Sequence, residues 1–279
     1  MRLATLRGPT GTVTVIVKGD EAVEIKGSAD VGALLADPRW RERAIAAGGP
    51  RHPLAAIADD QWAPVVPRPG KIVCVGLNYR SHILEMGREL PAHPTLFAKY
   101  PEALVGPYDP IRIPVHAADA VDWEAELAIV IGSRISEADT DAASAAIAGY
   151  SVLNDVTMRD YQNRTLQWLQ GKTFDQTAPF GPVLVTADEF APGPRITCTV
   201  NGETVQDGAT DDLVFGPAEL VSYISSIVTL NPGDVIASGT PGGVGHARTP
   251  ARYLSIGDEL ETAVEGIGTL RNRVGARER

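Results

Sequence analysis

A short stretch of alternating acidic and apolar residues, VDWEAELAIVIG at positions 121–132, places the strongest constraint on how this chain can fold. Side chains alternate between the two faces of a β-strand, so Glu124 and Glu126 share one face, and the apolar run at 127–131 predicts that the strand continues into a buried core. Two carboxylates at the start of such a strand repel each other and lose hydration. A divalent cation would offset both effects. The alternative is a solvated strand edge in which Asp122 joins the two glutamates.

The composition favours a strand-rich globular protein. Of 279 residues, 44% are hydrophobic and 22% charged, which is ordinary for a globular chain, while 28 glycines and 21 prolines predict many turns. The net charge of −10 and the lack of a basic stripe argue against a nucleic-acid partner. No apolar run has the length of a membrane helix and the N-terminus lacks a signal-peptide core, so we expect no membrane partner and a cytoplasmic location. Cys74 and Cys198 are expected to be buried free thiols.

Residues 1–66 are predicted to form a small separate α+β unit. Two short strands are expected within 13–26, followed by a helical pattern at 30–47 that an Asp-Pro pair interrupts. A proline-rich linker then leads into a second domain, residues 67–279. We expect the chemistry to lie in this second domain.

The second domain opens with a predicted buried strand at 71–76, followed by LNYRSHILEMG. His82 and Glu85 are three residues apart, so they share a face if a short helix begins at Ser81. A carboxylate beside an imidazole fixes its tautomer and raises its basicity, which is the arrangement of a water-activating pair. A surface ion pair at helical spacing is the simpler alternative.

A third carboxylate follows farther along the chain. A helix is predicted at 136–148 and a strand at 150–156, near whose end Asp155 lies. A strand–helix–strand unit can place this strand beside the one that carries Glu124 and Glu126. Three carboxylates without a thiolate or a histidine pair favour Mg²⁺, Mn²⁺ or Ca²⁺ over zinc.

Other polar residues nearby are candidates for binding an anionic ligand. Arg159 can clamp a carboxylate, or it can pair with Asp160 or another acid. Lys172, flanked by small residues, can stabilise an enolate or alkoxide oxygen near the carboxylates, although a single lysine is more often found at the surface. Gly239 and Thr240 begin a glycine-rich loop that can present N–H groups and a hydroxyl to an anion; a plain glycine-rich turn is the alternative.

The remaining pattern adds elements at short intervals. It predicts a hairpin around an Asn-Gly turn at 201–202, an amphipathic helix at 215–229, a buried strand at 235–238 and a closing pair of strands within 260–274.

The order of these motifs resembles that of the fumarylacetoacetate hydrolase family in its small bacterial form. The matching series is VGLNYRSHILEMG, DWEAELAIVIG, GYSVLNDVTMRDYQ, GKTFD with FGP, NGE, GDVIASGTPGGVG and GDELE, and it covers residues 70–274. The resemblance implies a strand-rich α+β fold, namely a mixed β-roll with few helices to which the small N-terminal α+β unit is added. It also implies a homodimer.

The resemblance further implies a Mg²⁺ or Mn²⁺ site and substrates that are 2-oxo acids with a second carbonyl or carboxylate group. The implied metal ligands are Glu124, Glu126 and Asp155. The residues expected to act in catalysis are His82, Glu85 and Lys172, and those expected to bind the substrate are Arg159, Gln162, Thr240 and, beside it, Gly239.

One reaction is favoured by this resemblance, and several alternatives stay open. The favoured reaction is divalent-metal-dependent hydrolysis of a C–C bond in an acylpyruvate-type 2,4-dioxo acid. In it His82, oriented by Glu85, activates water, and Lys172 stabilises the metal-bound pyruvate enolate that leaves. Oxaloacetate decarboxylation and isomerisation of a 2-hydroxy-dienedioate use related enolate chemistry and belong to the same family. A non-catalytic, metal-stabilised binding protein is the alternative from outside the enzymes.

Overall fold

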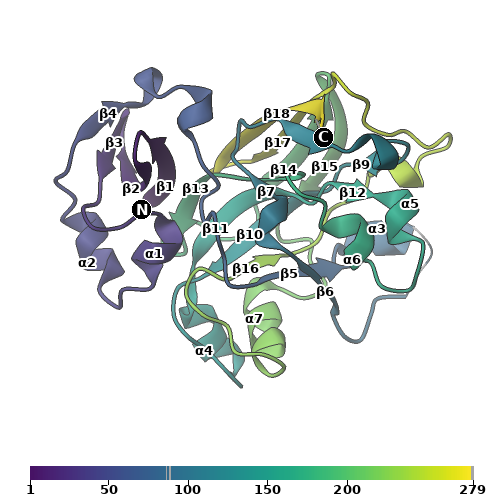
Figure 1. Ribbon diagram of the computed structural model, residues 1–279. Coiled ribbons are helices and arrows are strands. Elements are labelled where there is room, and N and C mark those ends of the chain that lie inside the picture. The colour runs from purple at the N-terminus through teal and green to yellow at the C-terminus, as the bar shows by residue number, and fades with distance from the viewer. Residues whose placement is uncertain (86, 88, 278–279) are drawn as a thin grey trace.

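A long mixed β-sheet runs through the molecule in the computed structural model, which describes every residue except 86, 88, 278 and 279 (Figure 1). Within that described part the sheet has eleven strands. In spatial order they are β4 (Arg51–Pro53), β3 (Glu21–Glu24), β2 (Gly11–Lys18), β1 (Arg2–Gly8), β13 (Ala178–Thr186), β11 (Ile147–Asn154), β10 (Ala125–Ile131), β16 (Val235–Ala237), β5 (Ile72–Gly76) and β6 (Thr95–Lys99), with β7 (Leu104–Val105) beside β13.

A second sheet packs against the middle of the first. Its strands, in spatial order, are β15 (Glu203–Ala209), β14 (Arg195–Val200), β17 (Glu259–Val264), β18 (Gly268–Ala276) and β8 (Ile111–Ile113), and a separate short pair joins β12 (Thr157–Met158) to β9 (Val121–Asp122). Leu127 of the first sheet and Leu270 of the second lie in one buried hydrophobic cluster. The strand-rich α+β fold that was predicted is therefore confirmed.

The helices are short and lie outside the sheets. They are α1 (Val31–Leu35), α2 (Trp40–Ile45), α3 (Arg80–Glu85), α4 (Thr140–Ala145), α5 (Arg159–Gln162), α6 (Leu169–Lys172) and α7 (Pro217–Ser225). Helices α4 and α7 lie together below the centre of the first sheet, and α5 and α6 lie at its far side from the N-terminus (Figure 1). Among the residues described, no helix is long and apolar enough to cross a membrane.

Strand β10 has the buried character that its sequence predicts. Each of its residues is buried, and its side chains alternate between two hydrophobic clusters: Leu127 and Ile129 belong to one, Ala128 and Val130 to the other. The strand therefore has hydrophobic core on both faces, while β11 and β16 pair with its two edges in the sheet. The solvated-edge interpretation is wrong, since the acidic residues at its start are buried too.

Helix α4 is shorter than the predicted helix at 136–148. Asp139, not Ser136, caps its N-terminus, because its carboxylate accepts a hydrogen bond from Ala142 N at 2.8 Å. The chain already enters β11 at 147, and Gly149, which seemed to stop a helix, lies inside that strand. A Cβ on Gly149 would lie 2.1 Å from the carbonyl oxygen of Val185 in β13. The glycine therefore permits a close approach of two strands and does not end a helix.

The N-terminal segment contains a strand that the sequence reasoning missed. Strand β1 pairs antiparallel with β2 and also with β13, so Arg2 lies opposite Val185. The N-terminal strands, purple in Figure 1, thus continue the main sheet. The division into residues 1–66 and 67–279 stays a prediction.

Three local predictions are confirmed. The helical pattern at 30–47 is broken into α1 and α2, as the Asp-Pro pair predicts. Asn201 and Gly202 have φ values of 52° and 80°, the left-handed conformation that an Asn-Gly hairpin turn requires. Cys74 and Cys198 are free and buried.

Candidate metal and substrate site

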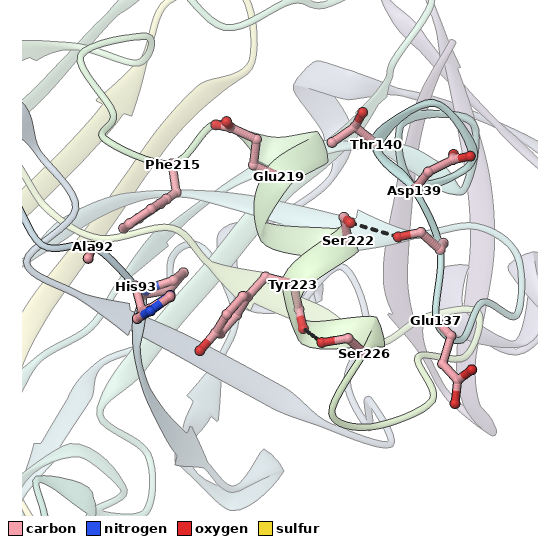
Figure 2. A pocket seen from close by; sticks show the side chains of 12 residues that line it. Ala92, His93, Glu137, Asp139, Thr140, Phe215, Glu219, Ser222, Tyr223 and Ser226 are labelled. Atoms are coloured by element: carbon pink, nitrogen blue, oxygen red, sulfur yellow. Dashed lines mark hydrogen bonds between the residues drawn. The ribbon is translucent and has the colours of Figure 1, made fainter.

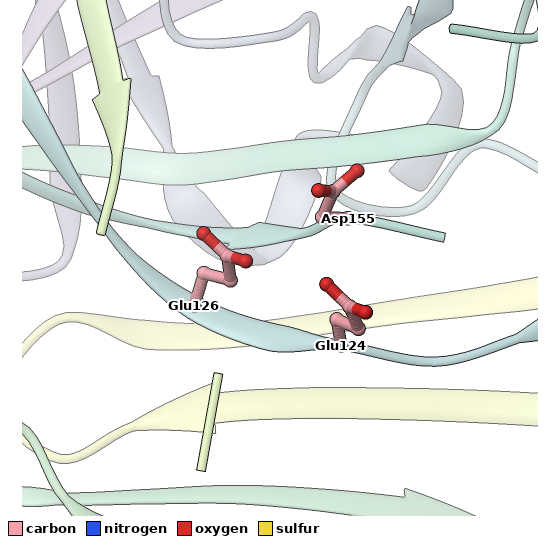
Figure 3. A group of neighbouring side chains, drawn as sticks. All are labelled: Glu124, Glu126 and Asp155. Carbon is pink, nitrogen blue, oxygen red and sulfur yellow. The ribbon is translucent and has the colours of Figure 1, made fainter. Parts of the chain in front are cut away.

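Three carboxylates meet where β10 and β11 lie side by side (Figure 3). Glu126 lies in β10, Glu124 precedes that strand and Asp155 follows β11, and one oxygen atom from each lies within 4.8 Å of the others. The pairing of Ala125 with Asn154 sets this arrangement, since Asp155 N then donates to the carbonyl oxygen of Glu124 at 2.8 Å. The predicted convergence of the three acids is confirmed.

The triad could hold a metal ion. Glu124, Glu126 and Asp155 are 7%, 2% and 0% exposed, so little water reaches them. Burial, together with the charges of Asp155 and Glu124, raises the pKa of Glu126 well above its usual value. Hard oxygen donors that repel one another in a dry site fit a divalent cation, which would remove the repulsion.

Two buried lysines contact the same acids. Lys172 Nζ lies 2.6 Å from Glu124 Oε2 and 3.1 Å from Asp155 Oδ2. Lys99 Nζ lies 2.8 Å from Asp155 Oδ1 and also donates to the backbone carbonyl of Lys172. Lys99 was not predicted, because nothing in LFAKY distinguishes it from a surface lysine.

These charges determine the ionisation of the site. Burial alone would raise the pKa of Asp155, but the ammonium groups of Lys172 and Lys99 outweigh it and lower that pKa. Burial alone would lower the pKa of Lys172, but Asp155 and Glu124 outweigh it and raise that pKa. Lys172 therefore keeps its proton beside the triad and can donate hydrogen bonds from there.

Arg159 is also held by acids. Its Nη2 lies 2.8 Å from Asp122 Oδ2 and 2.8 Å from Glu124 Oε1, and its Nη1 donates to Gln162 Oε1 at 2.9 Å. The ion-pair alternative is thus confirmed, and the acids are Asp122 and Glu124, with Asp160 not among the partners found. Arg159 links the triad to Gln162, which was also a predicted site residue.

The glycine-rich loop contacts the triad directly. Gly239 N donates to Glu126 Oε2 at 2.9 Å, and its φ of +100° favours glycine. Thr240 Oγ1 accepts a hydrogen bond from Gln206 Nε2 at 2.7 Å. Gln206 in turn accepts from Ala125 N, next to the two glutamates. Gln206 was not predicted, because it lies in an unremarkable strand of the second sheet.

A cavity of about 240 Å³ opens onto these groups. The predicted site residues that line it are His82, Glu124, Glu126, Arg159, Gln162, Lys172 and Thr240. Asp155 lies beneath them, in contact with both lysines. Glu85 ends α3, but its side chain lies outside the described residues, so its pairing with His82 stays a prediction.

One wall of this cavity is aromatic. Phe97 and Trp168 meet edge to face with ring centroids 5.5 Å apart, and Lys172 Nζ lies 5.3 Å from the centroid of Phe97. A Cβ on Gly76 would lie 2.2 Å from the Trp168 ring, so this glycine makes room for the indole. Neither aromatic residue was singled out from the sequence.

A second, wider cavity of about 550 Å³ lies between the loop at 92–94 and helices α4 and α7 (Figure 2). His93 stacks on Tyr223 there, with centroids 6.1 Å apart. Among the described residues, this cavity and the cavity at the triad share no lining residue. The sequence-predicted chemistry therefore belongs to the smaller cavity.

Comparison with known proteins gives an independent view of this arrangement. The family model described as fumarylacetoacetate (FAA) hydrolase C-terminal matches residues 71–275. Human oxaloacetate tautomerase FAHD2A, a mitochondrial protein, is 44% identical over 236 residues, which cover 83% of this chain and 74% of that protein.

Solved structures of similar proteins superpose on this chain over nearly its whole length. Fumarylacetoacetate hydrolase from the psychrophile Exiguobacterium antarcticum superposes with a TM-score of 0.88 at 33% identity and covers 99% of this chain and 100% of its own. The 5-carboxymethyl-2-hydroxymuconate delta-isomerase from Mycobacterium smegmatis superposes with a TM-score of 0.82 at 34% identity and covers 100% of both chains. Similar folds thus carry proteins named for different reactions.

Proposed function

This chain belongs to the fumarylacetoacetate hydrolase family, and from that premise we propose that it is a divalent-metal-dependent enzyme that interconverts the keto and enol forms of a dicarboxylic 2-oxo acid such as oxaloacetate. The relatives named oxaloacetate tautomerase support this substrate, since one of them shares 44% identity over most of the chain. The structural neighbour named as an isomerase supports a proton transfer as the reaction type.

The metal site of this proposal consists of Glu124, Glu126 and Asp155. Mg²⁺ or Mn²⁺ suits these ligands, because both prefer carboxylate oxygens. When bound, such an ion would polarise the 2-oxo group and make the neighbouring C–H bond more acidic.

The observation that carries the proposal is the position of Lys172. Its buried ammonium group lies 2.6 Å from Glu124 and lines the same cavity as the triad. A fixed, buried cationic donor stabilises negative charge that develops on a substrate oxygen. Lys172 would therefore donate a hydrogen bond to the C2 oxygen as C3 loses its proton.

The base in this scheme is His82. Its side chain lines the cavity together with Lys172. An imidazole can take a proton from C3, and a proton from solvent then completes the enol at the C2 oxygen. His82 releases its proton to solvent, so His82 and Lys172 both end in the protonation state in which they began. The same steps in reverse convert the enol to the ketone, so no atom is gained or lost.

Hydrolysis of an acylpyruvate is the second candidate. It needs His82 to activate water, and the placement of His82 and Lys172 in one cavity favours it as well. The two reactions differ in whether water attacks a second carbonyl and whether a C–C bond breaks. They therefore differ in their products, which makes them separable by experiment.

The test follows three substrates by NMR, with Mg²⁺ or with EDTA. Enol-oxaloacetate, incubated with the enzyme and Mg²⁺, is expected to reach the keto form faster than the uncatalysed rate, with EDTA abolishing the acceleration. Acetylpyruvate tests hydrolysis, and pyruvate release from oxaloacetate tests decarboxylation. Acetate and pyruvate from acetylpyruvate, without tautomerisation, would replace the first candidate with the second.

A further inference from the structure

A histidine that the proposed reaction does not use lies at the edge of the active-site cavity. His246 lines this cavity together with Glu124 and Lys172, and it is exposed, so it lies where the cavity opens to solvent. It follows the glycine-rich loop that begins at Gly239. An imidazole at this position would meet the part of a ligand that extends from the buried triad toward solvent.

The backbone of His246 is fixed relative to the triad. His246 N donates to Asp122 Oδ2 at 2.9 Å, and Gly245 N donates to Asp122 Oδ1 at 2.7 Å. Asp122 is paired with Arg159, which in turn contacts Glu124. A Cβ on Gly245 would lie 1.9 Å from the carbonyl oxygen of Arg252, so the loop is closely packed at this turn.

The ring of His246 is held as well. Its Nδ1 lies 2.9 Å from the hydroxyl oxygen of Tyr253, and the two rings are tilted at 31° with centroids 6.3 Å apart. When the Tyr253 hydroxyl donates to Nδ1, the neutral ring carries its proton on Nε2, and a protonated ring carries one there too. Nε2–H is then the donor that remains for a ligand.

The charge balance of the cavity leaves a role for such a donor. Four carboxylates (Asp122, Glu124, Glu126 and Asp155) and three cations (Lys99, Arg159 and Lys172) form the buried cluster. When all are ionised they leave one net negative charge, which a divalent ion would change to one net positive charge. That charge matches the single carboxylate next to the 2-oxo group. The buried cluster offers no further cation for a carboxylate at the other end of the ligand.

We propose that His246, positioned by Tyr253, binds the distal carboxylate of the 2-oxo acid and makes the enzyme prefer dicarboxylic over monocarboxylic ligands. This inference rests on the proposed function, because it assumes that the 2-oxo acid head lies at the triad. His246 would then be a specificity-determining residue, and Tyr253 a positioning residue that acts through it.

The test compares two ligands that differ at the distal group and cannot enolise. They are 3,3-difluoro-oxaloacetate and trifluoropyruvate, in which fluorine replaces the distal carboxylate. Binding of each to the Mg²⁺-loaded full chain is measured by titration calorimetry, so tautomerisation plays no part, and NMR of the ligand after titration verifies that difluoro-oxaloacetate has not been decarboxylated. The variants are His246→Phe, His246→Gln and Tyr253→Phe, and His93→Phe, in the other cavity, is the matched control (Figure 2).

We expect the wild-type chain to bind the dicarboxylate more tightly. His246→Phe should weaken binding of the dicarboxylate about tenfold, as expected for the loss of a charge-assisted hydrogen bond. Its affinity for trifluoropyruvate should stay within about twofold of the wild-type value. Gln can keep a side-chain N–H donor, so His246→Gln should retain part of the preference, and Tyr253→Phe should lose part of it. His93→Phe should match the wild type.

Two further outcomes distinguish a failure of this inference from a failure of the proposed function. An unchanged ratio of the two affinities in His246→Phe would overturn the role of His246 and leave the proposed function standing. Failure of both ligands to bind the Mg²⁺-loaded wild-type chain would overturn the proposed function, and with it this inference. Thermal unfolding of each variant verifies that it is folded before titration.

Discussion

The ammonium group of Lys99 lies 2.8 Å from Oδ1 of Asp155, and neither side chain is exposed to solvent. The same ammonium group donates to the backbone carbonyl of Lys172, whose own side chain contacts the other oxygen of Asp155. One buried cation therefore fixes a carboxylate of the triad and the main chain of the lysine beside it. It leaves Asp155 Oδ2 as the oxygen that contacts Lys172.

Lys99→Met should destabilise the protein strongly. Methionine has a similar length but no charge, so the buried Asp155 carboxylate would lose one of its two cationic partners. Breaking a buried ion pair from one side costs about 3–5 kcal/mol of unfolding free energy. Urea unfolding in EDTA measures this loss. Lys18→Met, at an exposed lysine, is the matched control and should change stability by less than about 0.5 kcal/mol. Equal, small losses in both variants would show that Lys99 does not support Asp155.

Glu126→Gln should stabilise the metal-free protein and strongly reduce its stabilisation by metal. Burial, with Asp155 and Glu124, raises the pKa of Glu126. A carboxyl group whose pKa rises on folding stabilises the folded state below its ordinary pKa, and that contribution is lost as the pH rises through the folded-state pKa. In EDTA the wild-type chain should therefore lose stability as the pH rises above about 4.5. Glutamine has the same shape but does not ionise, so the variant should not show this loss.

Melting curves in EDTA and in Mg²⁺ test both parts of this prediction. At 100 times its dissociation constant, Mg²⁺ should stabilise the wild-type chain by about 2.7 kcal/mol and the Glu126→Gln variant by much less. Glu265→Gln, at an exposed turn, should behave as the wild type does. A lower melting temperature for Glu126→Gln in EDTA above neutral pH would contradict the charge repulsion inferred here.

The parts of the site that the sequence predicts depend on local pattern. Alternation along 121–132 was enough to place Glu124 and Glu126 together, and the end of the next long strand was enough to add Asp155. The hairpin turn was likewise predicted from two neighbouring residues, Asn201 and Gly202. These features follow from the two-residue period of a strand and from the backbone preferences of two residue types.

The parts that the sequence did not predict depend on partners far along the chain. Lys99 acquires its role from Asp155 and Lys172, 56 and 73 residues away. Strand β1 pairs with β13 across more than 180 residues. Gly149 resembled a helix stop until its contact with Val185 was known. In each case the local sequence is compatible with several environments, and the tertiary contact selects one.

Gly76→Ala should weaken substrate binding by displacing Trp168. The new methyl group would lie 2.2 Å from the indole, which lines the cavity, so the ring has to move. We expect KM to rise several-fold with a smaller change in kcat, because the ring lies at the wall of the cavity and contacts no acid of the triad. Tryptophan fluorescence should shift in this variant. Gly48→Ala, where a Cβ meets no atom closer than 3.8 Å, is the control and should leave KM unchanged. An unchanged KM in Gly76→Ala would show that Trp168 does not shape the substrate site.

His82→Ala should abolish most turnover without affecting metal binding. His82 lines the cavity but is not one of the three carboxylates that would hold the ion, so Mg²⁺ should raise the melting temperature of the variant as much as that of the wild type. Removal of a general acid–base group typically lowers kcat by about 10²–10⁴-fold. Exchange of the C3 protons of oxaloacetate in D₂O, followed by NMR, measures the step assigned to this residue, and His93→Ala provides a histidine outside the site. A normal exchange rate in His82→Ala would show that another group abstracts the proton. Slow exchange together with a lost Mg²⁺ response would instead mean that His82 supports the metal site.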